Sequence, residues 1–311
     1  MKILATSDWH LTDKKSVAVS DDSWYEKQFA ALQWMNSLCE DKNIDVILLA
    51  GDIFDKAKQS NRLVRDTITA LNRFTTPIYS ISGNHDQPAH NYKALKESSY
   101  GVLCAAGVIE DKGDTVFNIG SHSSCLVLPY PFGHSTPADT ALSDISIVLV
   151  HRYIDPTGQF PGGSPCLSCQ EIKEWFPGTL IIAGDNHTPF TWSDEKSSTT
   201  IINPGSLFRY RANQIDHRPL VYIVEPRSIS AHEFFYTITP EYVPEEYLYT
   251  LDRSHLEKKE EKEKRGIVFI ESLGNIFECD LSFSDNLSKL MRGGEVSVKV
   301  RSKVNSALGD K

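Results

Sequence analysis

Carboxylate, imidazole and amide side chains follow five short apolar stretches of this chain. Two stretches end almost alike, in "VILLAGDIFD" (46–55) and "LIIAGDNHTPF" (180–190). The other three lead into "SDWH" (7–10), "GNHDQ" (83–87) and "VH" (150–151). These side chains bind divalent metal ions in proteins, and two neighbouring ions can activate water for attack on a phosphate ester. The residue types therefore predict a two-metal site that hydrolyses phosphodiester bonds.

Each polar cluster comes at the end of an expected strand. The near-continuous apolar runs that predict these buried strands lie at 2–7, 44–50, 77–82, 145–150 and 179–183. Apolar residues at helical spacing predict helices over 24–41 and 61–73. Strands separated by helices indicate a mostly parallel sheet covered on both faces. Because functional side chains gather outside the carboxyl ends of such strands, residues distant in the sequence can converge there.

The second half of the chain is expected to contain more antiparallel strands. Residues 114–119 and 124–128 have the pattern of a hairpin, and further strands are expected at 199–203, 220–224 and 229–235. The later strands follow one another closely without helices between them. The sequence therefore predicts a mixed α/β protein, with α+β character in its second half.

Taken singly, each motif has an ordinary structural explanation. An Asp-x-His pair such as Asp8 and His10 often arises by chance, and His151 alone could be a core or edge histidine. Gly-Asn-His-Asp is also a favourable turn sequence. The metal site is predicted from the conjunction, in which five clusters each come directly after an apolar strand.

The ordered motifs resemble the signature of the calcineurin-like metallophosphoesterases over roughly residues 1–235. The stretches "TSDWHL" (6–11), "AGDIFD" (50–55), "LPYPF" (128–132) and "NPGSLF" (203–208) are similar to the nuclease subunit of SbcCD complexes. That subunit is the bacterial and phage counterpart of the Mre-type double-strand-break repair nucleases. The resemblance implies a four-layer αββα sandwich of two mixed sheets with a small C-terminal appendage.

The resemblance also implies which residues hold two metal ions. The first ion would be bound by Asp8, His10, Asp52 and His187, and the second by Asp52 as a bridge, Asn84, His151 and Asp185. Position 185 is usually histidine in the family and is aspartate here. A carboxylate favours harder ions, so we expect manganese, with magnesium as the alternative.

Two residues are expected to act without binding metal. By resemblance, His85 would lie beside the ions and protonate the leaving oxygen or stabilise the transition state. Asp55 is placed to hydrogen-bond His85, or else caps its loop. Arginine and aromatic residues can also grip a phosphate backbone and stack on bases. Arg209, Tyr210 and Arg211 are of these residue types and follow an expected strand. They are either nucleic-acid ligands or packing and rim residues.

The resemblance implies a metal-dependent DNA nuclease, an exonuclease on duplex ends and an endonuclease on single strands or hairpins. Hydrolysis would proceed by in-line attack of a bridging hydroxide, in recombination, repair or replication. The implied partners are DNA, an SMC-like ATPase subunit and a second nuclease subunit. Two alternatives stay open, a small-molecule phosphodiesterase or phosphomonoesterase of the same fold and a scaffold subunit with a decayed site. A protein phosphatase is less favoured, because "DKAK" (55–58) replaces Asp-Arg-Gly.

Composition limits the class of protein. The net charge of −9 argues against coating nucleic acid by bulk electrostatics. No apolar run reaches the ~20 residues that span a bilayer, so no membrane association is expected. Six cysteines scattered over 311 residues favour reduced thiols in the cytoplasm, which would be the host cytoplasm if the chain is phage-encoded. A single Cys-x-x-Cys, "CLSC" (166–169), lacks the second pair of a zinc ribbon.

Three segments are expected along the chain. Residues 1–240 would form the metallophosphoesterase domain. Residues 241–265 include a highly charged run and would form a solvated helix or linker. Residues 266–311 would form a small capping or partner-docking segment, whose shortness suits a phage-encoded version.

Overall fold

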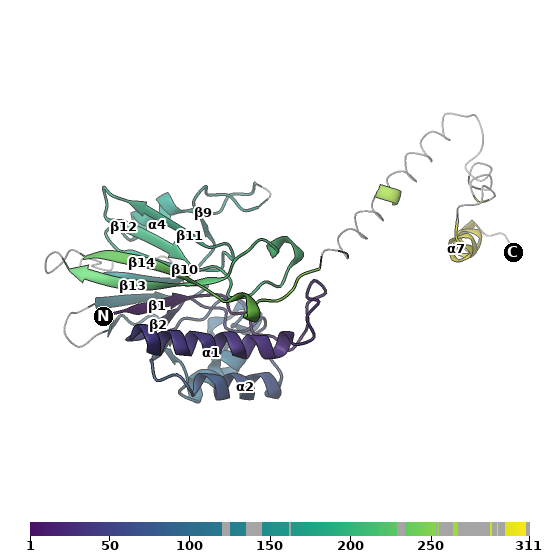
Figure 1. Ribbon diagram of the computed structural model, residues 1–311. Helices are drawn as coiled ribbons and strands as arrows, with labels where there is room; N and C mark the ends of the chain where they lie inside the picture. The colour runs from purple at the N-terminus through teal and green to yellow at the C-terminus, as the bar shows by residue number, and fades with distance from the viewer. Residues whose placement is uncertain are drawn as a thin grey trace. The chain divides into compact units, whose positions relative to one another are not determined.

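The computed structural model describes most of the chain. It covers residues 1–119, 125–134, 145–161, 163–228 and 234–252, and beyond these residues 254, 264–266, 287, 291 and 296–308. The chain divides into two compact units, Met1–Asp252 and Arg253–Lys311. The first unit is a mixed α/β structure with two six-stranded mixed sheets (Figure 1).

The first sheet is mixed and has the strand order β14-β13-β1-β2-β3-β4. Its strands are β1 (Ile3–Thr6), β2 (Val46–Leu49), β3 (Ile78–Ser80), β4 (Glu110–Asp111), β13 (Leu220–Ser228) and β14 (Phe234–Tyr242). The strands β1 to β4 are parallel, whereas β13 and β14 are added antiparallel at one side. The carboxyl ends of β1, β2 and β3 therefore lie at one edge of this sheet.

The second sheet has the order β11-β12-β10-β7-β6-β5. Its strands are β5 (Phe117–Ile119), β6 (Cys125–Tyr130), β7 (Ile145–His151), β10 (Leu180–Gly184), β11 (Phe190–Asp194) and β12 (Thr199–Asn203). The four central strands are parallel, and the outer strands β5 and β11 are antiparallel to their neighbours. A separate small parallel pair is formed by β8 (Ile154–Asp155) and β9 (Leu167–Ser168).

Several helices begin or end at recognisable capping residues. The α-helices are α1 (Trp24–Lys42), α2 (Asn61–Leu71), α3 (Ser99–Ala105), α4 (Cys169–Trp175) and, in the second unit, α7 (Val298–Leu308). The Ser60 side chain accepts the N–H of Leu63 at the start of α2. Ser168 and Glu171 form a capping box at the start of α4. Helix α1 ends at Asn43 in the left-handed conformation.

Short 3₁₀ turns lie within the connections. They are η1 (Pro88–His90), η2 (Tyr92–Glu97), η4 (Ala212–Gln214) and η5 (Glu245–Tyr247). The first two follow β3, and η4 precedes β13, so they occur in segments that leave or enter strands.

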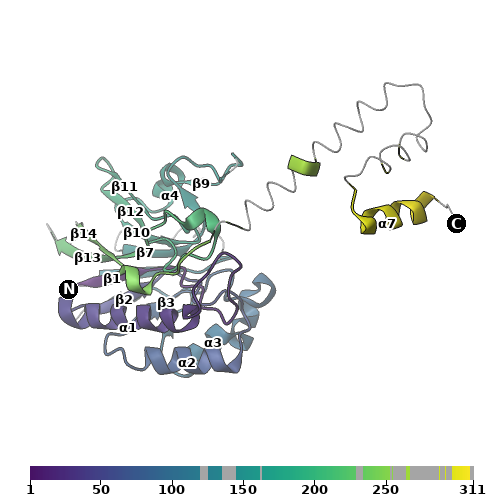
Figure 2. The same cartoon turned by 45° about the vertical axis from the view of Figure 1, so that its right-hand side comes forward.

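Four layers pack around three buried apolar clusters. Along β1, Leu4 packs toward α1 and α2, whereas Ile3 packs between the two sheets. Along β7, Ile147 packs between the sheets and Val148 packs toward α4. Successive strand residues point to opposite faces, so strands buried on both faces are apolar throughout. Figures 1 and 2 show α1 and α2 against one sheet and α4 against the other. The expected αββα sandwich is confirmed.

Most elements expected from the sequence are present. The hairpin of β5 and β6 is antiparallel as expected. In the strand expected at 229–235, residues 229–233 lie outside the described part, and β14 covers 234–242. Helices α3 and α4 and strand β11 were not expected. These three elements have at most seven residues each, too few to show a clear apolar period.

The first unit ends at Asp252, whereas the expected nuclease domain ends at residue 240. The intervening segment contributes Val243, Leu248 and Tyr249 to the core of the first unit. The highly charged run and the C-terminal segment lie largely outside the described residues.

Two further findings concern composition. Among the described residues, no helix is both long enough and apolar enough to cross a bilayer. The five cysteines in the described part of the chain are free, and Cys169 of the Cys-x-x-Cys is buried in the cluster between α4 and its sheet.

The packing of α1 on the first sheet can be tested at Leu32. This side chain is fully buried, so Leu32→Ala is expected to lower the free energy of unfolding by about 2–5 kcal/mol through lost contacts and a residual cavity. The adjacent Gln33 is exposed, and Gln33→Ala should change it by less than about 0.5 kcal/mol. Urea denaturation followed by circular dichroism measures both. Equal stability of the two variants would contradict this packing.

Candidate metal centre

The polar clusters lie at the carboxyl ends of strands from both sheets. Asp8 and His10 follow β1, Asp52 follows β2, Asn84 and His85 follow β3, His151 ends β7, and Asp185 and His187 follow β10. In the registers, Thr6 at the end of β1 pairs with Leu49 of β2, and His151 of β7 pairs with Gly184 of β10. Both pairs of strands therefore end level with one another, and the sandwich brings the two edges together.

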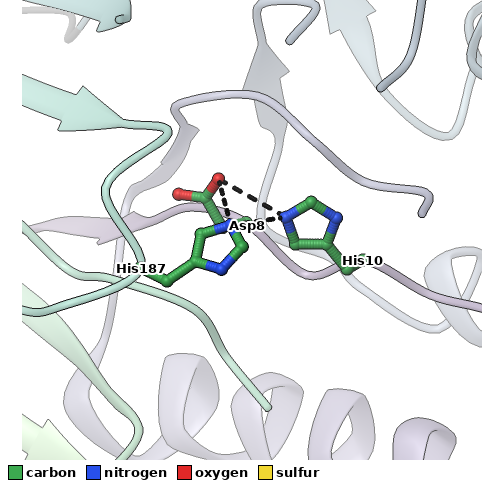
Figure 3. Close-up of side chains that lie close together, drawn as sticks. All are labelled: Asp8, His10 and His187. Atoms are coloured by element: carbon green, nitrogen blue, oxygen red, sulfur yellow. Dashed lines mark hydrogen bonds and ion pairs between the residues drawn. The ribbon is translucent and has the colours of Figure 1, made fainter. Parts of the chain in front are cut away.

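One group of side chains consists of Asp8, His10 and His187 (Figure 3). Nε2 of His10 and Nε2 of His187 are 3.0 Å apart. Asp8 Oδ1 lies 3.7 Å from Nε2 of His10 and 3.9 Å from Nε2 of His187. Two imidazole nitrogens and a carboxylate oxygen thus converge from strands of different sheets.

A second group lies around Asp52. Its Oδ2 atom is 3.6 Å from Nε2 of His10 and 3.4 Å from Nε2 of His151. Asn84 Oδ1 lies 2.9 Å from the same nitrogen of His151. Asp52 is therefore shared between the neighbourhoods of His10 and His151, as a carboxylate that bridges two ions must be.

The donor set fits divalent metal ions. Asp52 Oδ2 is buried and has no hydrogen-bond partner among the described residues, although a buried polar atom is normally paired. Nδ1 of His151 donates to the carbonyl oxygen of Ala50 at 2.7 Å, which fixes the ring so that Nε2 is the atom that faces Asp52 and Asn84. An unpaired carboxylate oxygen beside an oriented imidazole nitrogen is the arrangement that a cation completes.

The buried charges shift one another's ionisation. Burial alone would raise the pKa of Asp8 and Asp52, but the neighbouring imidazoles lower both below the usual range of a carboxyl. Conversely, burial opposes the charged forms of His10 and His151, and the carboxylates of Asp8 and Asp52 raise the pKa of both. Burial, with repulsion from His10, lowers the pKa of His187 to about 4. The site therefore stabilises anionic carboxylates by positive charge close to them.

The backbone at the site is held in an unusual conformation. Asp8, His10, Asp52 and Asp185 have φ values of 51°, 44°, 55° and 81°. The left-handed region is sparsely populated by residues other than glycine, and each such residue costs about 1–3 kcal/mol. Backbone hydrogen bonds maintain it, from Asp8 N–H to Gly51 O and from His10 N–H to Asp52 O, both at 3.0 Å.

Asp86 organises the loops beneath the site and was not predicted from the sequence. Its carboxylate accepts the backbone N–H groups of Asp52 at 2.9 Å, Gly83 at 3.0 Å and Phe54 at 3.3 Å. Asp86 is fully buried, and burial together with the charge of Asp52 raises the pKa of its carboxyl to about 7. The sequence signal for this role is the aspartate in fourth position of Gly-Asn-His-Asp, because a turn alone does not require an acidic residue there.

Two glycines allow the loops to approach the ligands closely. A Cβ atom at Gly83 would lie 2.0 Å from Asp52 Oδ1, and one at Gly51 would lie 2.4 Å from Nδ1 of His151. Real Cβ contacts are longer than 3.0 Å, so larger residues at these positions would displace Asp52 or His151. Gly83 is needed for space, and Gly51 both for space and for its φ of 90°.

Asp185, in the second stretch that contains Ala-Gly-Asp, makes different contacts from Asp52 in the first. The backbone N–H of Asp185 donates to both carboxylate oxygens of Asp8 at 3.1 Å. The side chain of Asp185 is partly buried, and burial raises the pKa of its carboxyl. It lies outside the compact Asp and His groups found among the described residues. Its carboxylate lines the cavity beside those groups.

His85 lies against the centre and is oriented by Asp55 through the backbone. The rings of His85 and His10 are in edge contact, with centroids 4.7 Å apart. Nδ1 of His85 donates to the carbonyl oxygen of Asp55 at 2.6 Å, so the partner is the main chain rather than the Asp55 carboxylate. The His85 N–H also donates to Asp52 Oδ1 at 2.9 Å. Residue 55 therefore fixes the imidazole whatever its side chain is.

Of the three expected nucleic-acid ligands, two have structural contacts. The guanidinium of Arg209 donates to the carbonyl oxygens of Ile215 and Tyr249, both at 3.1 Å. The Tyr210 hydroxyl donates to the carbonyl oxygen of His10 at 2.9 Å. Arg211 is exposed and lines the cavity at the centre. These contacts match the packing alternative for Arg209 and Tyr210 and leave only Arg211 accessible to a ligand.

The stretches "NPGSLF" and "LPYPF" hold the site loops in place. Within the first, Leu207 N–H donates to Asp8 O at 3.2 Å, and Ser206 N–H donates to His187 O at 3.2 Å. Within the second, Phe132 N–H donates to Ser82 O at 3.1 Å. These stretches thus fix the turns that carry the candidate ligands.

A model described as calcineurin-like phosphoesterase matches residues 1–189, and the chain belongs to this family. It is therefore a hydrolase of phosphate esters whose Asp and His groups suit divalent metal ions.

Two curated relatives carry more specific names. A nuclease SbcCD subunit from Bacillus subtilis is 36% identical over 92 residues, which cover 28% of this chain and 22% of the relative. DNA double-strand break repair protein Mre11 from Methanosarcina acetivorans is 23% identical over 320 residues, which cover 97% of this chain and 50% of the relative. The chain thus spans half or less of the length of these relatives. A phage origin stays a prediction.

A solved structure supports the fold. A dimetal phosphatase from Danio rerio is 11% identical, and the match covers 79% of this chain and 97% of that one with a TM-score of 0.50. At this identity the similarity concerns the fold alone, and it agrees with the sandwich described above.

The close approach of Gly83 to Asp52 gives a direct test of the centre. Gly83→Ala would place a Cβ against Asp52 Oδ1, and we expect manganese affinity to fall about 10- to 100-fold. Gly266→Ala is the control, because Gly266 has no positive φ and a Cβ there meets no atom within 4 Å. Isothermal titration calorimetry measures both. Unchanged affinity in the Gly83 variant would show that Asp52 does not bind the ion.

Proposed function

We propose that this chain is a metal-dependent DNA nuclease that hydrolyses phosphodiester bonds at duplex ends and in single strands or hairpins. The observation that carries the proposal is the convergence of Asp8, His10, Asp52, His151 and His187 at the facing edges of two sheets. The family supplies phosphoester hydrolysis. The names of the two curated relatives, a nuclease subunit and a double-strand-break repair protein, support DNA as the substrate.

Seven residues would hold two divalent ions in this proposal. They are Asp8, His10, Asp52, Asn84, His151, Asp185 and His187. When bound, the ions would supply positive charge to the phosphate oxygens and lower the pKa of a water molecule. Asp52 would be the shared ligand, because its unpaired Oδ2 faces His10 on one side and His151 on the other.

The residues that do not bind metal would orient and protonate the substrate. His85 would donate a proton to the leaving oxygen from Nε2, because its Nδ1 is engaged by the Asp55 carbonyl. That hydrogen bond fixes the plane of the ring. Arg211, exposed in the same cavity as His85 and His187, would attract the phosphate backbone.

The identity of the ions and the partners are further parts of the proposal. The carboxylate of Asp185 makes the donor set harder than one with a histidine there, which favours manganese and then magnesium. One relative is named as a subunit of a complex. We propose that this chain likewise assembles with an ATPase subunit of the SMC-like type and as a dimer of nuclease subunits. Docking to the ATPase subunit would fall to residues 266–311.

The proposed activity is tested by offering two substrates with manganese. We expect the protein to degrade linear duplex DNA and to lose this activity in EDTA. Cleavage of a small aryl phosphodiester without any cleavage of DNA would instead indicate a small-molecule phosphodiesterase. Inertness toward both substrates, with the ATPase subunit present, would contradict the enzymatic function and favour a scaffold role.

The role of His85 is tested by separating metal binding from turnover. His85→Ala should keep manganese affinity within about twofold, since the variant retains the seven proposed ligands, and should lower the rate of DNA cleavage about 10²- to 10⁴-fold. His90→Ala, a change at an exposed histidine, is the matched control. Calorimetry and single-turnover cleavage measure the two quantities. A His85 variant that cleaves like the control would remove His85 from the chemistry.

A further inference from the structure

A large groove adjoins the candidate metal centre. It has a volume of about 1000 Å³ and begins at His85, Asp185 and His187. From there it extends past β11 to β13 and β14, where Tyr222 and Tyr242 line it. Small-molecule sites commonly measure ~300–1,000 Å³. The groove is therefore larger than a single phosphate ester at the metals requires.

One wall of the groove carries an exposed aromatic pair. The rings of Tyr153 and Phe160 lie with centroids 4.4 Å apart and planes inclined by 33°. Phe160 is 39% exposed. It is held at a tight turn, in which its N–H donates to Ser164 O at 2.8 Å and its carbonyl accepts the N–H of Gly163 at 2.9 Å. Both aromatic residues line the groove.

Arginine side chains and a further aromatic ring line the same groove. Arg211 and Arg218 are exposed and line the groove. The guanidinium carbon of Arg218 lies 4.2 Å from the ring centroid of Tyr242, which is itself 43% exposed. Asp216 and His217 also line this part of the groove. Arginines that alternate with exposed rings form the arrangement that binds unpaired nucleotides.

We propose that this groove binds the unpaired nucleotides of a nucleic-acid strand next to the phosphate that is cleaved. A base stacks on Phe160, which Tyr153 supports, and backbone phosphates contact Arg211 and Arg218. The strand is unpaired at this point because a base in a duplex is already stacked on both faces and cannot cover an exposed ring. The inference rests on the proposed nuclease function and assigns its substrate-positioning residues.

Binding of a fluorescein-labelled oligothymidylate, measured by anisotropy in EDTA to prevent cleavage, tests the groove. Phe160→Ala should weaken binding about 5- to 150-fold through loss of one stacked base. Arg218→Ala should reduce the slope of log affinity against log salt concentration by about 0.7, because one phosphate contact is lost. Matched controls are Phe235→Ala and Arg227→Ala, at exposed positions on β14 and β13 that do not line the groove.

The hydrolysis of a small aryl phosphodiester with manganese separates failure of this inference from failure of the proposed function. A small ester occupies only the end of the groove at His85, Asp185 and His187. The wild-type protein and the control variants Phe235→Ala and Arg227→Ala should therefore hydrolyse it. If wild-type protein cleaves DNA and Phe160→Ala binds the oligonucleotide as tightly as Phe235→Ala, the groove assignment is overturned and the nuclease function stands. If wild-type protein cleaves only the small ester and binds no oligonucleotide, the nuclease function fails. Equal weakening toward a blunt duplex would overturn the assignment to unpaired nucleotides.

Discussion

The close approach of two buried carboxylates, Asp8 and Asp52, is the constraint on which the site depends. Both lie at the ends of adjacent parallel strands and are at most 1% exposed. Burying an ionised carboxylate without compensation costs several kcal/mol. Imidazoles from both sheets provide positive charge, and Asp52 Oδ2 still lacks a hydrogen-bond partner among the described residues. A bound divalent cation would compensate the remaining negative charge of the two carboxylates. The centre therefore has the properties of a metal-binding site.

The surrounding structure holds Asp8 and Asp52 in place despite their strained backbone and buried charge. Left-handed backbone at Asp8 and Asp52 is stabilised by strand-to-strand hydrogen bonds, and the Asp86 carboxylate gathers the N–H groups of the loop that carries Asp52. Gly83 leaves space that a Cβ would occupy. The stacking of two sheets is needed because His151 and His187 come from the second sheet. Fold and chemistry are thus linked through the facing carboxyl edges of the sandwich.

Sequence patterns predicted the elements that carry the site, because apolar strands followed by Gly-Asp or Gly-Asn-His have a strong local signal. They did not predict Asp86, and they left Arg209 open between a nucleic-acid ligand and a packing residue, since both roles depend on tertiary contacts. The Arg209 guanidinium binds a carbonyl of Tyr249, 40 residues further along the chain. His85 was expected to contact the Asp55 carboxylate, and its partner is the Asp55 carbonyl oxygen. Side-chain identity alone cannot distinguish these two partners.

Anomalous diffraction from crystals soaked in manganese measures the central claim most directly. Two peaks are expected on either side of the Asp52 carboxylate, one beside Asp8, His10 and His187 and one beside Asn84, His151 and Asp185. Occupation of both positions would establish that the buried carboxylates are balanced by two cations. Manganese bound elsewhere, or no anomalous signal between the two sheet edges, would contradict the account.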